Sequence, residues 1–258
     1  MQLLNPSYII FIMLVFARVS GLMVAAPVFS QQNIPVQVRV LFSVLFAYSI
    51  AGIVPGPLPP HTDQAVGLIL VAIHELLVGL ILGFVAQFIF WSIQFAGELI
   101  GFQMALRMAQ VFDPIGGFNS NPIGRLLTMI MTVVFLILDG HHLVLEAFVG
   151  SYRVIPLAGA TFANIGPPLI NYTGHMFHIA LRLAAPFMIT LYLIDVALGV
   201  FVRAVPRADI FAIALPLKLL TGLLVAYLFM QRLIPIIPSL VDNMNTNILR
   251  IIEIIAPA

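Results

Sequence analysis

The sequence predicts an all-α integral membrane protein built from long, broken and re-entrant helices. Of its 258 residues, 62% are hydrophobic and 8% are charged, whereas a typical soluble domain has about 25% charged residues. Long apolar runs alternate with short stretches rich in proline and glycine, which end helices. The nearly uniform apolar content indicates one membrane-embedded domain, residues 1–258, whose surface contacts lipid, other subunits or both.

The charge balance argues against a nucleic-acid-binding surface. The formal net charge is +1, with ten arginines and one lysine, so no basic face is available for nucleic acid. Arginine in place of lysine is typical of fixed, partly desolvated ion pairs. The absence of cysteine excludes disulfides, thiolate metal sites and cysteine nucleophiles.

Apolar runs define the expected helices. The helical segments are expected at 8–29, 40–54, 65–106, 126–152, 176–202 and 210–230. The first ends at the polar stretch 30–33 and the second at the proline-rich stretch 55–60. The third meets no proline before Pro114, so it could run for about 65 Å at about 1.5 Å per residue. A bilayer core is only about 30 Å thick, so this helix must project from the hydrocarbon or fold back near Gly97 or Gly101.

The later segments depart from simple membrane spans. Asp139 interrupts the fourth after about 20 Å of helix, a length that suits a re-entrant or buried helix. Residues 153–173 are expected to form a connecting loop, Pro186 and Pro216 lie inside the last two segments, and 248–255 is amphipathic. Ionisable residues near the middle of most segments cost about 2.5–3.5 kcal/mol each in lipid. Other protein is therefore expected to cover these faces.

Polar and small residues recur along one face of the third segment. Steps of four residues align side chains on one helix face, and glycine lets another helix approach closely. This stripe is expected to form a subunit interface and contains Glu75, Gly79, Gly83, Gln87, Glu98 and Gly101. Helix packing within the chain and an aqueous path remain open as alternatives.

Charged residues inside apolar runs indicate buried ion pairs. Arg18, Asp195 and Lys218 are expected to be buried, and Lys218 should pair with a carboxylate, Asp195 or Asp209 being nearest in sequence. Such residues could also form the ion relay of a polytopic secondary transporter. Against that alternative, the two halves of the sequence show no internal repeat, the usual sign of such a site.

The sequence predicts neither an enzyme nor a metal site. His175 and His178 have a spacing that a helix could use, and His141-His142 is close to Asp139. However, no HExxH motif exists to place such ligands on one turn. Ser151 has no base at a defined spacing, as a nucleophile would need. We therefore expect no catalytic residue, metal or cofactor.

An ordered set of motifs across nearly the whole chain identifies a family. The motifs are Arg18 with Ala26-Pro27, Ile34-Pro35 with Arg39, the Glu75/Gly79/Gly83 helix, Gly97–Met104, Asp113-Pro114 with Pro122, Asp139-Gly140-His141, and Arg203, Pro206, Ile210-Phe211 and Pro216-Leu217-Lys218. In this order they resemble the FliR/SctT family of type III export gates, and the flagellar FliR branch more than the injectisome SctT branch. Departures from the family pattern are Gln37, Ala105, Arg207 and Asp209, and glycine is common at the position of Ala105.

The resemblance implies a non-enzymatic structural subunit of the bacterial flagellar type III protein export gate. Such a subunit forms and gates the channel through which unfolded flagellar proteins are exported. One copy is expected in a helical assembly with FliP and FliQ, with FlhB near the cytoplasmic entrance. The implied location is the bacterial inner membrane, in the flagellar basal body, in contact with membrane lipid.

The resemblance also implies a channel plug in the loop after the long third helix. Its apolar members here are Met104, Met108, Val111 and Phe112. Methionine is flexible enough to close around changing cargo, and an aromatic ring fills a pore. A buried packing loop is the alternative.

Overall fold

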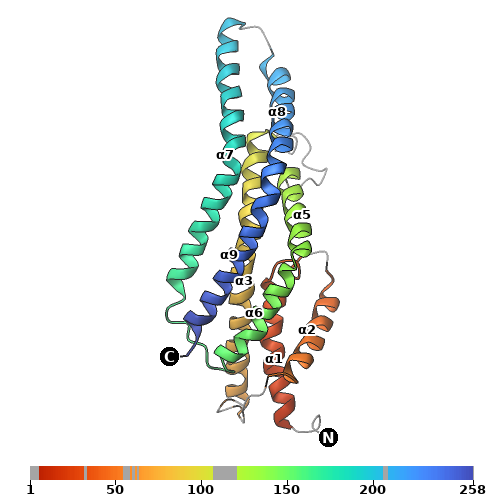
Figure 1. Ribbon diagram of the computed structural model, residues 1–258, viewed down its shortest axis with the longest axis vertical. Coiled ribbons are helices and arrows are strands. Elements are labelled where there is room, and N and C mark those ends of the chain that lie inside the picture. The colour runs from red at the N-terminus through yellow and green to blue at the C-terminus, as the bar shows by residue number, and fades with distance from the viewer. Residues whose placement is uncertain are drawn as a thin grey trace. The chain divides into compact units, whose positions relative to one another are not determined.

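The computed structural model describes residues 6–31, 34–54, 59, 62, 64–106, 121–205 and 209–257, and in this part of the chain every regular element is helical. The elements are α1 (Pro6–Ala25), α2 (Val36–Ala51), α3 (Ala65–Gln103), α5 (Pro122–Ile137), α6 (Gly140–Val154), α7 (Gly166–Ala204), α8 (Ile210–Leu233), the short 3-10 helix η2 (Ile234–Ile236) and α9 (Ile237–Ile255) (Figure 1). The predicted all-α fold is confirmed.

The lengths of these helices match a membrane protein. Among the described residues, four helical stretches are long and apolar enough to cross a bilayer, and α5 with α6 makes a fifth if the pair is one broken span. The four are Pro6–Ala25, Ala65–Gln103, Gly166–Ala204 and Ala212–Ile255. With 16 residues, α2 is shorter than the roughly 20 residues that a span requires. An integral membrane protein with long and broken helices is what the sequence predicts.

Helix α3 does not fold back at either Gly97 or Gly101, the two positions where the sequence allowed a turn. It contains 39 residues and passes Gly97 and Gly101 without a break. At about 1.5 Å per residue it is about 58 Å long. Of the two outcomes that the sequence left open, the structure has the single long helix.

Helices α7 and α9 begin about ten residues earlier than the sequence predicts, a larger difference than at the other helix starts. Helix α7 starts at Gly166, inside the expected loop 153–173, and α9 starts at Ile237. Pro167 and Pro168 therefore lie in the first turn of α7. The first N–H groups of a helix have no intrahelical acceptor, so proline removes nothing there. Reading these prolines as helix breakers was wrong for that reason.

The chain divides into two compact units, and α3, α7 and α9 each contribute to both. Unit 1 comprises residues 1–88, 139–172 and 241–258, and unit 2 comprises residues 89–138 and 173–240. In unit 1, α1 and α2 lie side by side (Figure 1). Its buried core includes Leu14, Val19, Leu22, Val78, Leu82, Phe148, Met244, Ile248 and Ile251.

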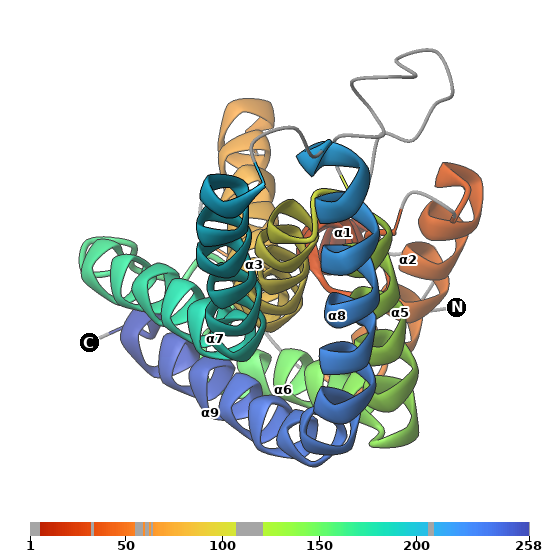
Figure 2. The ribbon, with the colours of Figure 1, turned by 90° about the horizontal axis from the view of Figure 1, so that it is seen from above.

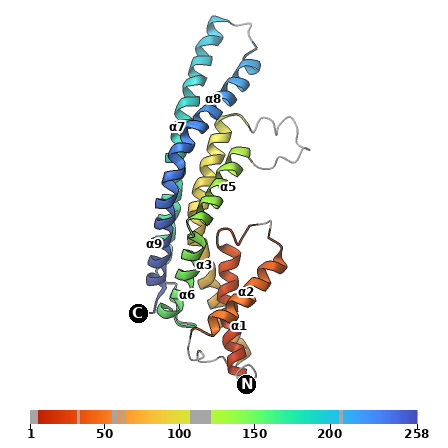
Figure 3. The same cartoon turned by 45° about the vertical axis from the view of Figure 1, so that its right-hand side comes forward.

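Unit 2 contains two helix pairs. Helix α5 lies beside the last part of α3, coloured yellow (Figure 2), and the rings of Phe90 and Phe135 meet edge to face at 5.2 Å. Helices α7 and α8 run side by side (Figure 3), joined by Phe187 and Phe229 at 5.3 Å. Much of α8 is apolar and exposed, so its surface needs lipid or protein around it.

Candidate functional site: a buried ion pair between closely packed helices

Arg18 of α1 is completely buried in unit 1. Its Nε donates to Oε2 of Glu75 at 2.5 Å. Both terminal nitrogens donate to the carbonyl oxygen of Ile155 at 3.2 Å, and Nη1 lies 3.4 Å from the hydroxyl of Ser151. The guanidinium carbon lies 4.1 Å from the ring centroid of Tyr152, a distance at which a cation is attracted to the ring face.

Glu75 of α3 is also completely buried. Its second oxygen, Oε1, accepts a hydrogen bond from the backbone N–H of Ala158 at 2.8 Å. Ala158 follows α6 and has a φ of 60°, in the left-handed region that non-glycine residues seldom adopt. The carboxylate therefore joins α1, α3 and the loop after α6.

The energetics of such a pair are asymmetric. Burying two charges costs about as much as their attraction returns, so the intact pair adds little net stability. Removing one partner leaves a buried charge unpaired and costs about 3–5 kcal/mol. Arg18 and Glu75 are 57 residues apart in sequence. The main effect of their pair is therefore to specify which helices pack together, and its net contribution to stability is small.

Glycine brings α1 and α3 close enough for this contact. A Cβ atom at Gly79 would overlap the carbonyl oxygen of Arg18, and one at Gly21 would overlap the carbonyl oxygen of Leu76. A Cβ atom at Gly83 would overlap the backbone nitrogen of Ala26, directly after α1. These backbones touch directly, as small residues permit in membrane helices.

The expected subunit interface is therefore corrected at its first three positions. Glu75, Gly79 and Gly83 contact α1 of the same chain. Packing within the chain was the alternative that the sequence left open. Glycines at steps of four residues predict a close helix neighbour but do not say whose helix it is.

The stripe continues into unit 2, where its glycines meet α5. A Cβ atom at Gly97 would overlap Gly124, and one at Gly101 would overlap the side chain of Asn121. Asn121 caps α5 by accepting from the N–H of Ile123 at 3.1 Å, and its amide donates to the carbonyl oxygen of Gly97 at 2.7 Å. Gly101 thus also packs within the chain.

Two further stripe residues are half-buried. Gln87 keeps its Oε1 shielded from solvent without a hydrogen-bond partner among the described residues. The carboxylate of Glu98 lies beside Gly124, whose Cβ position would be 3.3 Å from Oε1.

Lys218 pairs with one of the two carboxylates that the sequence offered. Its Nζ lies 2.5 Å from Oδ1 of Asp195, but the side chains are 18% and 37% exposed, respectively. Both residues are half-buried, so the expectation that they are buried is wrong, unlike that for Arg18. Gln103 donates to the other oxygen of Asp195 at 3.4 Å. Asp209 instead caps α8, accepting from the N–H of Ala212 at 3.2 Å. The pair lines a largely apolar pocket of about 300 Å³, together with Ala105 and apolar residues of α7 and α8.

The expected plug lies mostly outside the described residues. Met108, Val111 and Phe112 are among the residues that the structure does not describe. Met104 is described and is 2% exposed. It packs against Gly222 of α8, whose Cβ position would be 2.5 Å from the Met104 methyl group.

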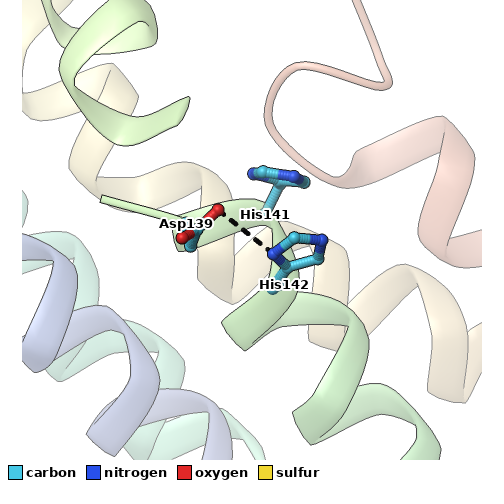
Figure 4. A group of neighbouring side chains, drawn as sticks. All are labelled: Asp139, His141 and His142. Atoms are coloured by element: carbon cyan, nitrogen blue, oxygen red, sulfur yellow. Dashed lines mark ion pairs between the residues drawn. The ribbon is translucent and has the colours of Figure 1, made fainter. Parts of the chain in front are cut away.

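Histidines and an aspartate meet at the start of α6 (Figure 4). Nδ1 of His142 lies 3.2 Å from Oδ1 of Asp139, and the rings of His141 and His142 are 4.1 Å apart. His175 and His178 stack at 6.2 Å on α7.

Ser151, Tyr152 and Gly21 belong to the Arg18 site but were not singled out for it from the sequence. One signal was available for Gly21, since it lies three residues after Arg18 and so on the same side of α1. No spacing rule could connect Arg18 with α6, more than a hundred residues away.

Together the fold and the site define an all-α integral membrane protein organised around buried, paired charges and direct helix contacts. A family model described as "Bacterial export proteins, family 1" matches residues 9–244. The chain belongs to this family.

Several relatives of the chain are flagellar proteins. The chain is 34% identical to the flagellar biosynthetic protein FliR of Bacillus subtilis (strain 168), over 80% of this chain and 81% of the relative. It is 32% identical to FliR of Pectobacterium carotovorum subsp. carotovorum, over 90% and 87% of the two chains. For FliR of Escherichia coli (strain K12) the identity is 28% over 91% and 88%. The predicted resemblance to FliR is confirmed.

Proposed function

We propose that the chain is a structural, non-enzymatic subunit of the flagellar type III export gate. It helps to form and gate the channel through which unfolded flagellar proteins leave the cell. The observation that carries the proposal is the match to the export family along residues 9–244, together with flagellar relatives of similar length. The transporter alternative has no comparable support.

The exposed apolar surface supports a role inside a larger assembly. Leu41 and Leu45 of α2 and Leu220 and Tyr227 of α8 are each more than half exposed. Lipid or neighbouring subunits must cover such residues. We assign this covering to membrane lipid and to FliP and FliQ, with FlhB as a further partner and one copy of this chain in each gate.

The location follows from the same reasoning. We place the chain in the bacterial inner membrane, within the flagellar basal body, and treat residues 1–258 as one export-gate domain. Gln87 and Glu98, which are half-buried, are the stripe positions that we still assign to a subunit interface. The Arg18–Glu75 and Asp195–Lys218 pairs hold the helices of each unit in the geometry that the partners recognise.

Export of a flagellar protein tests the proposal directly. A strain that lacks its own FliR gene and expresses this chain together with its partner subunits should secrete filament protein into the medium, measured by immunoblot. A chain with Glu75→Leu should be secretion-defective, whereas Glu146→Gln, on the exposed face of α6, should secrete normally. Secretion that does not depend on this chain would contradict the proposal.

We assign the plug to Met104, Met108, Val111 and Phe112, because apolar side chains can exclude water from a pore wide enough for an unfolded chain. Changing Met108 and Phe112 to glycine should leave the complex assembled but make the membrane leaky to small molecules. An assembled mutant gate that stays tight would show that this loop only packs against its neighbours.

A further inference from the structure

Three side chains that commonly bind metals converge at the start of α6. Each of Asp139, His141 and His142 offers one ligand atom, and these atoms all lie within 4.8 Å of one another (Figure 4). Two imidazoles and a carboxylate form a ligand set that suits Zn²⁺ and neighbouring first-row divalent metals. From the sequence no metal is expected here, because no HExxH motif places such ligands on one helix turn. At a helix start, however, the turn brings them together.

Asp139 and His142 are already as far apart as two ligands of one metal ion would be. Oδ1 of Asp139 and Nδ1 of His142 are 3.2 Å apart. Two ligands about 2.1 Å from a tetrahedral zinc ion are about 3.4 Å apart. Both side chains are about two-thirds exposed, at 71% and 68% respectively. An ion can therefore reach them from solvent, and small rotations can complete the site.

The third ligand carries a polar atom that nothing else engages. Nδ1 of His141 is shielded from solvent and has no hydrogen-bond partner in the described part of the chain. Leaving such an atom without a partner is unfavourable. Its ring stands beside that of His142, at 4.1 Å between centroids. A metal would supply the missing partner for an imidazole nitrogen in this pair.

The backbone holds Asp139 in the required position. Its φ is 54°, a left-handed conformation that aspartate and asparagine tolerate better than most residues. Its carbonyl oxygen accepts from the N–H groups of His142 at 2.9 Å and Leu143 at 3.2 Å. The turn that presents the carboxylate to His142 is therefore fixed without the ion.

We propose that Asp139, His141 and His142 form a surface site for a divalent first-row transition metal, with Zn²⁺ as its occupant and water completing the coordination. A bound ion ties the residue before α6 to the first turn of that helix. Helix α6 carries Ser151 and Tyr152 of the Arg18 site near its other end. The metal would thus steady the helix that closes the buried ion pair.

Calorimetric titration of the detergent-solubilised full chain with ZnCl₂ tests the site. His175 and His178 form a second exposed pair that could also take up zinc, so the reference protein carries His175→Ala and His178→Ala. We expect this reference to bind one Zn²⁺, to bind Cu²⁺ and Ni²⁺ more tightly than Mn²⁺, and not to bind Mg²⁺ or Ca²⁺.

Two variants in that background decide whether the three residues are the ligands. Asp139→Asn keeps a residue that tolerates the left-handed turn but lacks the charged oxygen, and His142→Gln removes one imidazole. Each should weaken Zn²⁺ binding at least about tenfold, since even residues that only orient a ligand change affinity by about 10–100-fold. Circular dichroism should show unchanged helix content. If His142→Gln loses helix, Asp139→Asn alone decides.

The proposal is overturned if the reference protein shows no saturable Zn²⁺ binding. It is equally overturned if Asp139→Asn, with its helix content intact, binds Zn²⁺ as tightly as the reference protein. In that case Asp139 and His142 form only a surface ion pair.

Discussion

The buried guanidinium of Arg18 is stable without water because a carboxylate, a carbonyl oxygen and an aromatic ring surround it. Arg18 donates to the Glu75 carboxylate and to the Ile155 carbonyl oxygen, while its plane lies against the Tyr152 ring. Lysine could not do this, because its ammonium is a compact point charge without a planar fork. The side chain therefore determines at once how α1 meets α3 and how the end of α6 is placed.

Breaking this pair from one side should be far more harmful than removing it altogether. Glu75→Leu leaves an unpaired buried guanidinium and should lower the free energy of unfolding by about 3–5 kcal/mol. The double change Arg18→Leu with Glu75→Leu should cost less than Glu75→Leu alone. Denaturant unfolding in detergent measures both, with Glu146→Gln as the exposed control. A single-change cost below about 1 kcal/mol would mean that water or another group solvates Arg18.

Ala105 is a second residue whose conformation can be tested. It has a φ of 59°, at a position where the family resemblance leads us to expect glycine. Ala105→Gly relieves this left-handed strain and should stabilise the protein by up to about 1 kcal/mol. The control Ala197→Gly lies within helix α7 and should instead destabilise it by about 1 kcal/mol. Equal effects of the two changes in thermal unfolding would refute the strain at Ala105.

At the scale of elements, direct backbone contact between α1 and α3 organises unit 1. Gly79 and Gly21 lie where even a methyl group would overlap the backbone of the other helix. The resulting closeness lets the short Glu75 side chain reach Arg18. The helix contact and the ion pair therefore depend on each other.

Gly79→Ala separates those helices and should abolish the folded chain and with it the gate complex. The matched control is Gly174→Ala in α7, where a Cβ atom would meet nothing within 4 Å. Alanine there should be neutral or stabilise by up to about 1 kcal/mol, as its helix propensity predicts. Size-exclusion chromatography of detergent extracts reports both outcomes. A normally folded Gly79→Ala protein would contradict the close approach.

The helices could be predicted from the sequence because local signals specify where a helix forms. Which helices pack against each other could not be predicted in this way. Asp139 correctly marked the break between α5 and α6, because a polar residue before glycine interrupts an apolar run. The start of α7 was missed, since proline is compatible with a first turn as well as with a loop. Lys218 could be matched with Asp195 because the two helices are consecutive. The partner of Arg18 depends on a contact across 57 residues, which no local pattern encodes.

At the scale of the whole molecule, the described helices leave a large apolar surface without protein cover. Leu41 of α2 is 60% exposed and Leu220 of α8 is 67% exposed. In water, apolar patches of this kind would drive aggregation. The chain also belongs to the export family. We therefore infer that lipid and partner subunits cover this apolar surface.

Native mass spectrometry of the chain co-expressed with FliP and FliQ and extracted in mild detergent tests that claim most directly. We expect one copy of this chain in a single large complex with both partners, and loss of that complex with Gly79→Ala but not with Gly174→Ala. Recovery of the chain alone, or only as a homo-oligomer while FliP and FliQ assemble without it, would show that the chain is not a subunit of such a complex.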